Sequence, residues 1–353
     1  MTPPVQRVGY RSLVMALAGV CASAAVAGDS PEAEYLTNVR QVTSDFVKAG
    51  EGYFSPDMGT IIFQAVEEGY PFYRIFTMPL DGGKPRMVST GRGRTTCSYF
   101  RPDGRKILLA SSHLDPKLEE TEAAERAALE EEKKTGKKRR YSWPFDPWME
   151  IFEADPGGSN LKRLTEAKGY DAEGAYGPEG KRIAFCSFRD GDPDVWVMDA
   201  DGSNPRQLTD AKGYDGGPFI SPDGRWVVFR SDRKREHYLQ IYVIGIDGKH
   251  ETALTDNDGV NFGPYWYPKG PYIIWAGADH SNPNVRPNYD LWLMRYREED
   301  GRIRPGPTWR VTDHPAADVL PVFSPDGKKL MWTSTRGEKR SSQLWIADFT
   351  LPE

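Results

Sequence analysis

The stretch DPDVWVMDADGSNPRQLTDAKGYDGGPFISPDGRWVVFRSDR (192–233) contains the parts of a unit that recurs six times along the chain. Each unit has a short run ending in Thr or Ser. A proline turn follows that residue at a constant distance of 13 residues, from Thr43 and Pro56 to Thr312 and Pro325. The six runs are NVRQVT (38–43), KPRMVS (84–89), LKRLT (161–165), NPRQLT (204–209), TALT (252–255) and WRVT (309–312). A period of roughly 45 residues is typical of repeat folds such as the β-propeller.

Each unit contains four strand-like segments rich in β-branched and aromatic residues. The second segment follows the proline turn, as in RIAFCS (182–187), and the third carries an aliphatic–aromatic pair such as Val195-Trp196. Turns such as DADGSN (199–204) separate the third segment from the fourth, and Asp-Gly suits tight reversals. The pattern predicts an all-β fold, a six-bladed β-propeller with about four strands in each blade.

The last unit is split between the two ends of the chain. No Thr-terminated run follows SQLWIADF, which lies almost at the C-terminus, whereas NVRQVT (38–43) precedes the first complete unit. We therefore expect the N-terminal strand to close the last blade, so that residues 37–353 form one propeller. An unpaired third strand would otherwise leave an open sheet edge.

The first 27 residues have the features of a secretory signal. Arg7 and Arg11 precede an apolar stretch of small residues (12–27) that ends in Ala25-Val26-Ala27, and this order is typical of a cleaved signal peptide. A lipoprotein anchor on Cys21 is the alternative, although Val20 stands where such signals carry a small residue. We expect a periplasmic or secreted protein with no transmembrane segment after cleavage.

Charge and cysteine content restrict the function classes. Without Arg7 and Arg11, 46 − 2 = 44 basic and 51 acidic side chains remain, for a net charge of 44 − 51 = −7, which argues against nucleic acid as a partner.

Cys97 and Cys186 fall on strands of different blades. We expect them to lie too far apart for a disulfide and to remain buried thiols.

Two insertions interrupt the repeat, at 113–147 and 278–289. The first begins with HLDPKLEETEAAERAALEEEKK, whose Glu–Arg and Glu–Lys pairs and late lysines favour a projecting helix. Both insertions lie between second and third strands, so they should share one face of the propeller. YSWPFDPW (141–148) either joins the helix to the ring or forms an exposed aromatic platform for a sugar or peptide. That platform would contain Tyr141, Trp143, Phe145 and Trp148.

Motifs of nucleophilic or metal-dependent catalysis are absent from the sequence. It contains neither G-x-S-x-G nor H-E-x-x-H. Asp190, Asp192 and Asp194 alternate as calcium ligands do, but no bidentate Glu follows at the required distance. A Ser-x-Arg pattern follows several second strands, as in Ser187/Arg189 and Ser231/Arg233. Because it recurs, we interpret it as a structural bridge between blades.

Polar residues recur at the start of the innermost strands, where the mouth of the central channel is expected. Counting six and eight residues beyond each terminal Thr or Ser gives an oxygen-rich set: Glu51, Asp171, Glu173, Asp215, Asn261 and Asp318. Two interpretations remain open. Each carboxylate caps its own loop, or the ring receives a cation, either Ca²⁺ or a basic side chain of a partner. No other cofactor is predicted.

The units resemble the repeats of TolB-type six-bladed propellers. The segment 192–233 is close to the consensus of that family, with SPDG turns followed by a strand and S-x-R, and with the V-M-D-x-DG-S-N-x-R-x-LT run. The resemblance covers about 37–353 without the insertions. Proteins of the TolB type also carry an N-terminal α/β domain that connects them to an envelope system, and this sequence shows no counterpart of that domain.

The resemblance specifies a fold more than a function. It implies an exported, non-catalytic propeller, expected to be a monomer, that binds another envelope macromolecule, a protein or a polysaccharide. The alternatives are a periplasmic polysaccharide lyase or hydrolase and a carbohydrate-binding propeller. Catalysis would require acid, base or metal-binding residues that converge at one place on the face with the insertions.

Overall fold

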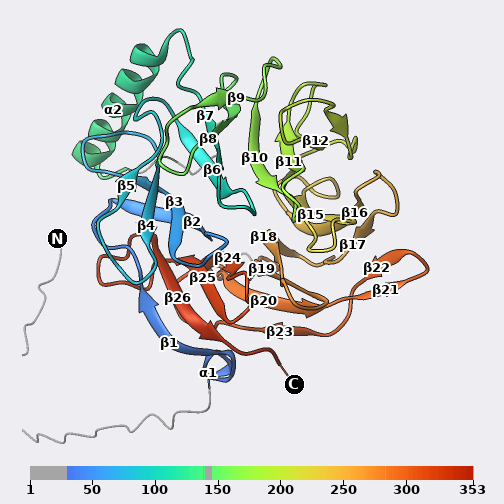
Figure 1. Cartoon of the computed structure of the whole chain (residues 1–353). Coiled ribbons are helices and arrows are strands. Elements are labelled where there is room, and N and C mark those ends of the chain that lie inside the picture. Colours follow the sequence, from blue (N-terminus) through green and yellow to red (C-terminus); the bar gives the residue numbers. More distant parts are fainter. Residues whose placement is uncertain (1–29, 138, 140–144, 283, 353) are drawn as a thin grey trace, which may run out of the picture.

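Six four-stranded antiparallel sheets surround a central axis in the computed structural model, which describes residues 30–137, 139, 145–282 and 284–352 (Figure 1). The predicted all-β, six-bladed propeller is therefore confirmed. The described residues also form two helices, α1 (Pro31–Tyr35) and α2 (Leu118–Thr135).

Blades 1 to 5 follow one another along the chain, and each is built from the axis outwards. Blade 1 contains β2 (Lys48–Phe54), β3 (Thr60–Val66), β4 (Arg74–Pro79) and β5 (Arg86–Met87). Blade 2 contains β6 (Thr95–Phe100), β7 (Ile107–Ser111), β8 (Glu150–Ala154) and β9 (Lys162–Arg163). Blade 3 contains β10 (Asp171–Tyr176), β11 (Arg182–Ser187), β12 (Asp194–Asp199) and β13 (Arg206–Gln207). Blade 4 contains β14 (Asp215–Ile220), β15 (Trp226–Ser231), β16 (Gln240–Gly245) and β17 (Thr252–Ala253). Blade 5 contains β18 (Gly259–Trp266), β19 (Tyr272–Asp279), β20 (Asp290–Arg295) and β23 (Thr308–Arg310), with the hairpin β21 (Arg297–Glu299) and β22 (Arg302–Arg304).

Blade 6 joins the two ends of the chain, as the split repeat predicts. It contains β24 (Asp318–Phe323), β25 (Lys329–Ser334), β26 (Gln343–Phe349) and the N-terminal β1 (Leu36–Gln41). Strand β1 pairs antiparallel with β26, with Leu36 opposite Phe349. The hydroxyl of Thr43 donates to Gln343 Oε1 at 2.8 Å and accepts the N–H of Leu344 at 2.9 Å. Strand β1 thus covers the edge of β26 that the C-terminal strands leave unpaired.

The core lies between neighbouring blades and around the axis. Each innermost strand packs against the next, in the closed order β2, β6, β10, β14, β18, β24 and back to β2. The second strands carry consecutive apolar residues because both faces of each sheet are covered, as with the fully buried Ile61, Ile62 and Phe63 of β3. Burying one such side chain contributes about 1.5–3 kcal/mol.

The insertion at 113–147 forms the predicted helix, α2, which lies outside the ring beside blades 1 and 2 (Figure 1). Its one buried residue, Glu122, accepts hydrogen bonds from the Tyr70 hydroxyl at 2.7 Å, Arg92 Nε at 3.0 Å and the Gly93 N–H at 3.1 Å. These donors belong to loops of blade 1 and its link to blade 2. A polar contact, not an apolar stripe, therefore anchors the helix to the ring.

The predicted signal segment, 1–27, and Cys21 within it lie outside the described residues. Among the residues that the structure describes, no helix is both long and apolar enough to cross a membrane. Cys97 and Cys186 are buried free thiols, as predicted.

Candidate central binding site

A bulge interrupts the pairing of every innermost strand at the same position. The register shifts after Gly50, Thr96, Ala172, Gly216, Phe262 and Val319 in β2, β6, β10, β14, β18 and β24. In each bulge one residue has a left-handed backbone, with φ between 48° and 61°. These six bulge residues are Glu51, Cys97, Glu173, Gly217, Gly263 and Leu320. A β-bulge re-aims side chains and often lies beside a functional site.

Glycine is the residue that favours this backbone, and blades 4 and 5 use it. A Cβ on Gly217 would lie 2.4 Å from Nη1 of Arg230, and a Cβ on Gly263 would lie 3.0 Å from Leu320 Cδ2. The other four blades place Glu51, Cys97, Glu173 and Leu320 in a conformation that costs a residue with a Cβ about 1–2 kcal/mol. Such strain persists where the surrounding structure holds it, often at a functional site.

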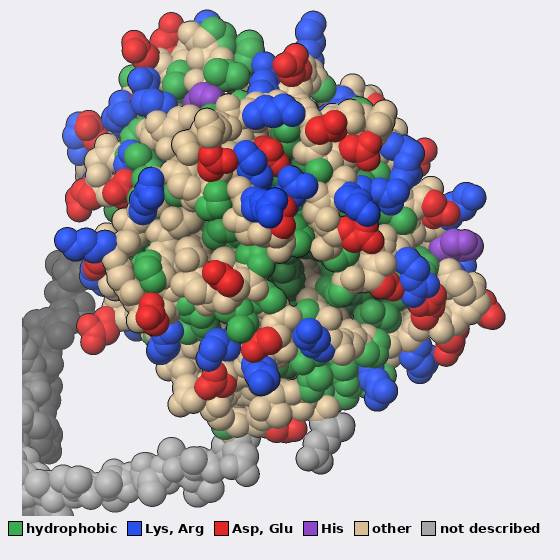
Figure 2. Space-filling model, viewed as in Figure 1, with side chains coloured by type: hydrophobic (Ala, Val, Ile, Leu, Met, Phe, Trp, Pro, Cys, Tyr) green, Lys and Arg blue, Asp and Glu red, His purple; other side chains and the backbone are tan. Residues whose placement is uncertain are grey.

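All six bulge residues line one central cavity of about 1980 Å³. Loops between second and third strands also line it, through His237, Tyr238 and His280. The cavity therefore opens on the face that carries both insertions. In the space-filling view, hydrophobic side chains surround a hollow near the middle of the molecule, and basic and acidic side chains mix around it (Figure 2).

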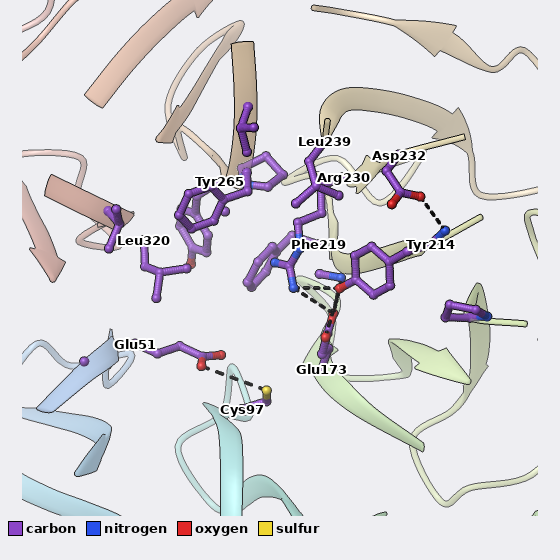
Figure 3. Close-up of a pocket in the computed structure, with 18 of the residues that line it drawn as sticks. Glu51, Cys97, Glu173, Tyr214, Phe219, Arg230, Asp232, Leu239, Tyr265 and Leu320 are labelled. Carbon is purple, nitrogen blue, oxygen red and sulfur yellow. Dashed lines mark hydrogen bonds and ion pairs between the residues drawn. The ribbon is translucent and has the colours of Figure 1, made fainter. Parts of the chain in front are cut away.

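The carboxylate of Glu173 is neutralised within the cavity wall. The Tyr214 hydroxyl donates to its Oε2 at 2.8 Å, Nη2 of Arg230 donates at 3.2 Å, and the Gly217 N–H donates to the same oxygen. Arg230 also donates to the Tyr214 hydroxyl at 2.7 Å. Because the carboxylate, phenol and guanidinium form one network, Glu173 brings no net charge to the cavity (Figure 3).

Glu51 lies across the cavity without such a partner (Figure 3). Its Oε1 is 3.4 Å from the Tyr53 hydroxyl and its Oε2 is 3.9 Å from the Cys97 thiol, and both donors are neutral. Among the described residues, no lysine or arginine forms an ion pair with Glu51. Burial and the charge of Glu173 raise the pKa of Glu51 to about 7, although Arg230 opposes the shift. Around neutral pH, this carboxyl group therefore changes charge.

The predicted placement of the three aspartates at the channel mouth is wrong. Asp171, Asp215 and Asp318 are buried and bonded to arginines: Arg189 reaches Asp171 Oδ2 at 3.1 Å, Arg233 bonds Asp215, and Arg336 Nε reaches Asp318 Oδ1 at 3.2 Å. They lie two residues before the bulge residue, and the bulge directs the later residue to the axis. Five of the six predicted residues therefore divide into two glutamates that line the cavity and three buried aspartates in ion pairs.

The same contacts correct the interpretation of the Ser-x-Arg pattern. Arg189 follows β11 and bonds Asp171 on β10, and Arg233 follows β15 and bonds Asp215 on β14. Both strands of each pair belong to one sheet. The pattern is structural, as predicted, but it bridges strands within a blade and not between blades.

Asn261 also serves its own blade. Its amide nitrogen donates to Gln240 Oε1 at 3.1 Å and Asn257 Oδ1 at 3.0 Å, and its oxygen accepts from Trp275 Nε1 at 2.9 Å. These three bonds satisfy a side chain that is buried. The structure therefore brings together Glu51 and Glu173 at the cavity and holds Asn261 in the blade.

Half of the proposed aromatic platform can be placed. Tyr141 and Trp143 lie outside the described residues. Phe145 is 41% exposed, lines the cavity rim, and packs with ring centroids 4.7 Å from Phe188 and 5.9 Å from Tyr214. Trp148 is 46% exposed and does not line the cavity. Phe145 thus extends the cavity wall outwards.

Asp190, Asp192 and Asp194 form a carboxylate group whose ligand atoms lie within 4.8 Å of one another. Thr209 donates to Asp194 Oδ1 at 2.9 Å and Gln207 donates to its Oδ2 at 3.1 Å. Burial, with nearby aspartates, raises the pKa of Asp194 to about 7. The third strand of blade 2 begins with the equivalent Glu150, which Arg163 neutralises. Burial also raises the pKa of Glu150, where Arg163 opposes the shift, whereas blade 3 has Gln207 in place of that arginine.

Arg230, Tyr214 and the channel aromatics escaped the sequence prediction. Arg230 lies within RWVVFRS, a second strand whose pattern indicates core packing only, and Tyr214 precedes the innermost strand of blade 4. One signal was present: blades 4 and 5 have glycine at the bulge position, whereas the other four blades have a residue with a side chain. Because the residue at this position differs between blades, its side chain is not required to form the repeated fold.

Comparison with known proteins shows that the chain is similar to TolB-type propellers. Residues 149–292 match the family described as the TolB β-propeller domain (PD40). A TolB homologue from Chlorobium luteolum is 25% identical over 176 residues, which make up 47% of this chain and 40% of the relative. The chain therefore matches less than half of that relative's length. The predicted resemblance to TolB-type six-bladed propellers is therefore confirmed.

Solved structures agree on the fold. A TolB-type protein from Agrobacterium tumefaciens superposes with a TM-score of 0.56 and 20% identity, over 86% of this chain and 91% of that one. TolB from Acinetobacter baumannii gives 0.51 and 18%, over 88% and 65%. Oligogalacturonate lyase from Vibrio parahaemolyticus gives 0.52 and 15%, over 86% and 77%. At these identities the likeness is one of fold, which a binding protein and a lyase share.

Proposed function

We propose that the protein is an exported binding propeller that receives a segment of another envelope protein in its central cavity. The observation that carries this function is the convergence of six bulge residues on one cavity, four of them in a backbone that glycine would adopt at lower cost. A fold that needed only a closed ring could use glycine at all six positions. The side chains at the other four bulge positions therefore indicate a role in contacting a ligand in the cavity.

The position of the insertions supports the same face as the binding surface. The cavity opens between loops that include His280 and Phe145, which belong to the two insertions. Enlarged loops around a concave site on a rigid scaffold are common at binding sites. The TolB-type relatives support a role in binding envelope proteins, and no catalytic step is assigned to the cavity.

Site-specific cross-linking tests the binding face. A photoreactive phenylalanine analogue replaces Tyr238 at the cavity rim or, as the control, Glu179 in the turn between β10 and β11 on the opposite face. We expect a discrete protein adduct in the producing cells from position 238 and not from position 179. Equal adducts at both positions, or none at position 238, would contradict the function.

A polysaccharide segment is the second candidate occupant, because the exposed Phe145 ring stands at the rim beside Phe188 and Tyr214. Aromatic rings with one free face suit sugar stacking. In the same experiment, an adduct that carries glycan and is removed by glycosidases would favour this candidate. An adduct that yields peptides of one protein would favour the protein segment.

A further inference from the structure

The floor of the central cavity is aromatic. Two residues beyond the bulge position, four blades contribute a ring: Tyr53, Tyr99, Phe219 and Tyr265. The centroids of Tyr53 and Tyr99 are 4.9 Å apart, as are those of Phe219 and Tyr265, and the centroids of Tyr53 and Phe219 are 5.9 Å apart. The Tyr99 and Tyr265 hydroxyls are joined by a hydrogen bond of 2.9 Å. Tyr53, Phe219 and Tyr265 line the cavity, and Tyr99 packs against the rings of Tyr53 and Phe219.

Glu51 lies next to this floor and carries the charge that the cavity does not balance. Its Oε1 is 3.4 Å from the hydroxyl of Tyr53, a floor residue, and its own N–H is held by Thr333 Oγ1 at 3.0 Å. Glu173 faces it across the cavity but is engaged by Arg230 and Tyr214. One carboxylate beside aromatic rings is the arrangement that recognises an organic cation, through an ion pair and cation–π attraction.

We propose, building on the binding function above, that the segment received in the cavity inserts one basic side chain, a lysine or an arginine, which pairs with Glu51 over the aromatic floor. Charge complementarity selects this occupant. An acidic segment would meet Glu51 with like charge, and a purely apolar segment would leave the carboxylate buried and unpaired, which is costly.

A calcium ion fits the same place poorly. Ca²⁺ takes six to eight oxygen ligands, whereas the side chains within reach of Glu51 offer a tyrosine hydroxyl and a thiol. The oxygens of Glu173 already accept hydrogen bonds from three donors. An ammonium or guanidinium group needs one carboxylate and adjacent aromatic rings, and both line this cavity.

A blocked pentapeptide with one central lysine and four glycines tests the charge preference directly. Its binding to the full mature chain is followed by NMR through the methyl groups of Leu320, which lines the cavity. The matched probe carries acetyllysine, which keeps the length and removes the charge. We expect the lysine peptide to bind at least tenfold more tightly than the acetyllysine peptide at pH 8.

Two substitutions locate the effect. Glu51→Gln should weaken binding of the lysine peptide about tenfold. Glu236→Gln, which removes the same charge from a rim side chain that is 86% exposed, should change it less than twofold. Unfolding curves confirm that each variant is folded. If Glu51→Gln does not fold, Glu51→Gly replaces it, because glycine occupies the same position in blades 4 and 5.

The pH dependence gives a second readout. Burial raises the pKa of Glu51 to about 7, so affinity for the lysine peptide should rise about tenfold between pH 5.5 and 8 and stay flat in Glu51→Gln. The groups that face Glu51 are Glu173, Arg230, Cys97 and Tyr53, of which the two charged ones form a pair.

The outcomes separate this inference from the proposed function. Equal binding of the two peptides, or unchanged binding in Glu51→Gln, would contradict the proposal that a basic side chain pairs with Glu51. If the adduct at position 238 nevertheless persists, the cavity still binds a protein, but one recognised by another chemistry. If position 238 forms no protein adduct but the cavity still prefers the lysine peptide, the proposed protein partner is wrong and the preference for a cation remains. Calcium would be supported instead if 1 mM CaCl₂ shifted the Leu320 methyl signals and the lysine peptide did not.

Discussion

Two sets of carboxylates lie two residues apart on the innermost strands and have opposite environments. Asp171, Asp215 and Asp318 precede the bulge, are buried, and each bonds an arginine of its own blade. Glu51 and Glu173 occupy the bulge and line the central cavity. The first set recurs with the repeat and stabilises the blade. The second set varies between blades, and we associate it with binding.

The largest expected effect comes from breaking a buried pair. Asp318 is fully buried, and it accepts from Arg336, whose side chain is 5% exposed, and from Trp332 Nε1 at 3.0 Å. Asp318→Ala should lower the free energy of unfolding by about 3 kcal/mol or more, because a buried guanidinium loses a partner. Chemical denaturation measures the change.

The control is an exposed pair of the same type. Asp256→Ala removes the partner of Lys234, and both side chains are largely exposed. This change should cost less than about 1 kcal/mol. Equal losses in the two variants would contradict the structural role assigned to the aspartates.

The next effect tests why blade 4 has glycine in its bulge. In Gly217→Ala, the new Cβ would lie 2.4 Å from Arg230 Nη1 in addition to adopting φ of +60°. We expect a loss of about 2 kcal/mol, since the backbone penalty of about 1 kcal/mol is joined by displacement of Arg230 from Glu173.

Gly104→Ala supplies the matched control. Gly104 has φ of +70°, and a Cβ added there would have no neighbouring atom within 4 Å, so the substitution carries the backbone penalty alone. Thermal or chemical unfolding of both variants separates the two effects. If Gly104→Ala cost as much as Gly217→Ala, the contact with Arg230 would not explain the glycine.

Features of the fold that recur in every repeat could be predicted from the sequence, and features that differ between repeats could not. The constant spacing from Thr43 to Pro56 and onwards predicted six blades, and the split unit predicted the pairing of β1 with β26. The prediction of which residues line the mouth of the channel was only partly correct. Counting residues along the strand identified Glu51 and Glu173, which line the cavity, but also Asp171, which does not. The bulge decides which of these positions faces the axis, and the spacing of the repeat does not reveal a bulge.

The pH dependence of stability gives a smaller effect that separates Glu51 from the paired aspartates. Its pKa is raised to about 7 by burial and by Glu173, above the value of about 4.3 in an unfolded chain. Between these two pH values the folded state holds the proton and the unfolded state does not, so stability falls as pH rises. We expect wild type to lose about 1.5 kcal/mol relative to Glu51→Gln between about pH 4.5 and 7.5, because the open cavity screens part of the shift.

Denaturation at several pH values checks this slope. Other raised carboxyl groups, such as Asp194 and Asp290, titrate in the same range in both proteins and cancel in the difference. A difference of the opposite sign would show that Glu51 is stabilised as a carboxylate in the free protein.

The smallest expected change in stability gives the most direct test of the central claim, that the bulge residues are kept for binding at the expense of the fold. Glu51→Gly restores the residue that blades 4 and 5 use and removes a strained backbone and an unpaired carboxylate. The variant should gain about 1 kcal/mol of unfolding free energy and lose the adduct formed through position 238. A variant that is less stable than wild type, and still forms the adduct in full, would contradict the account.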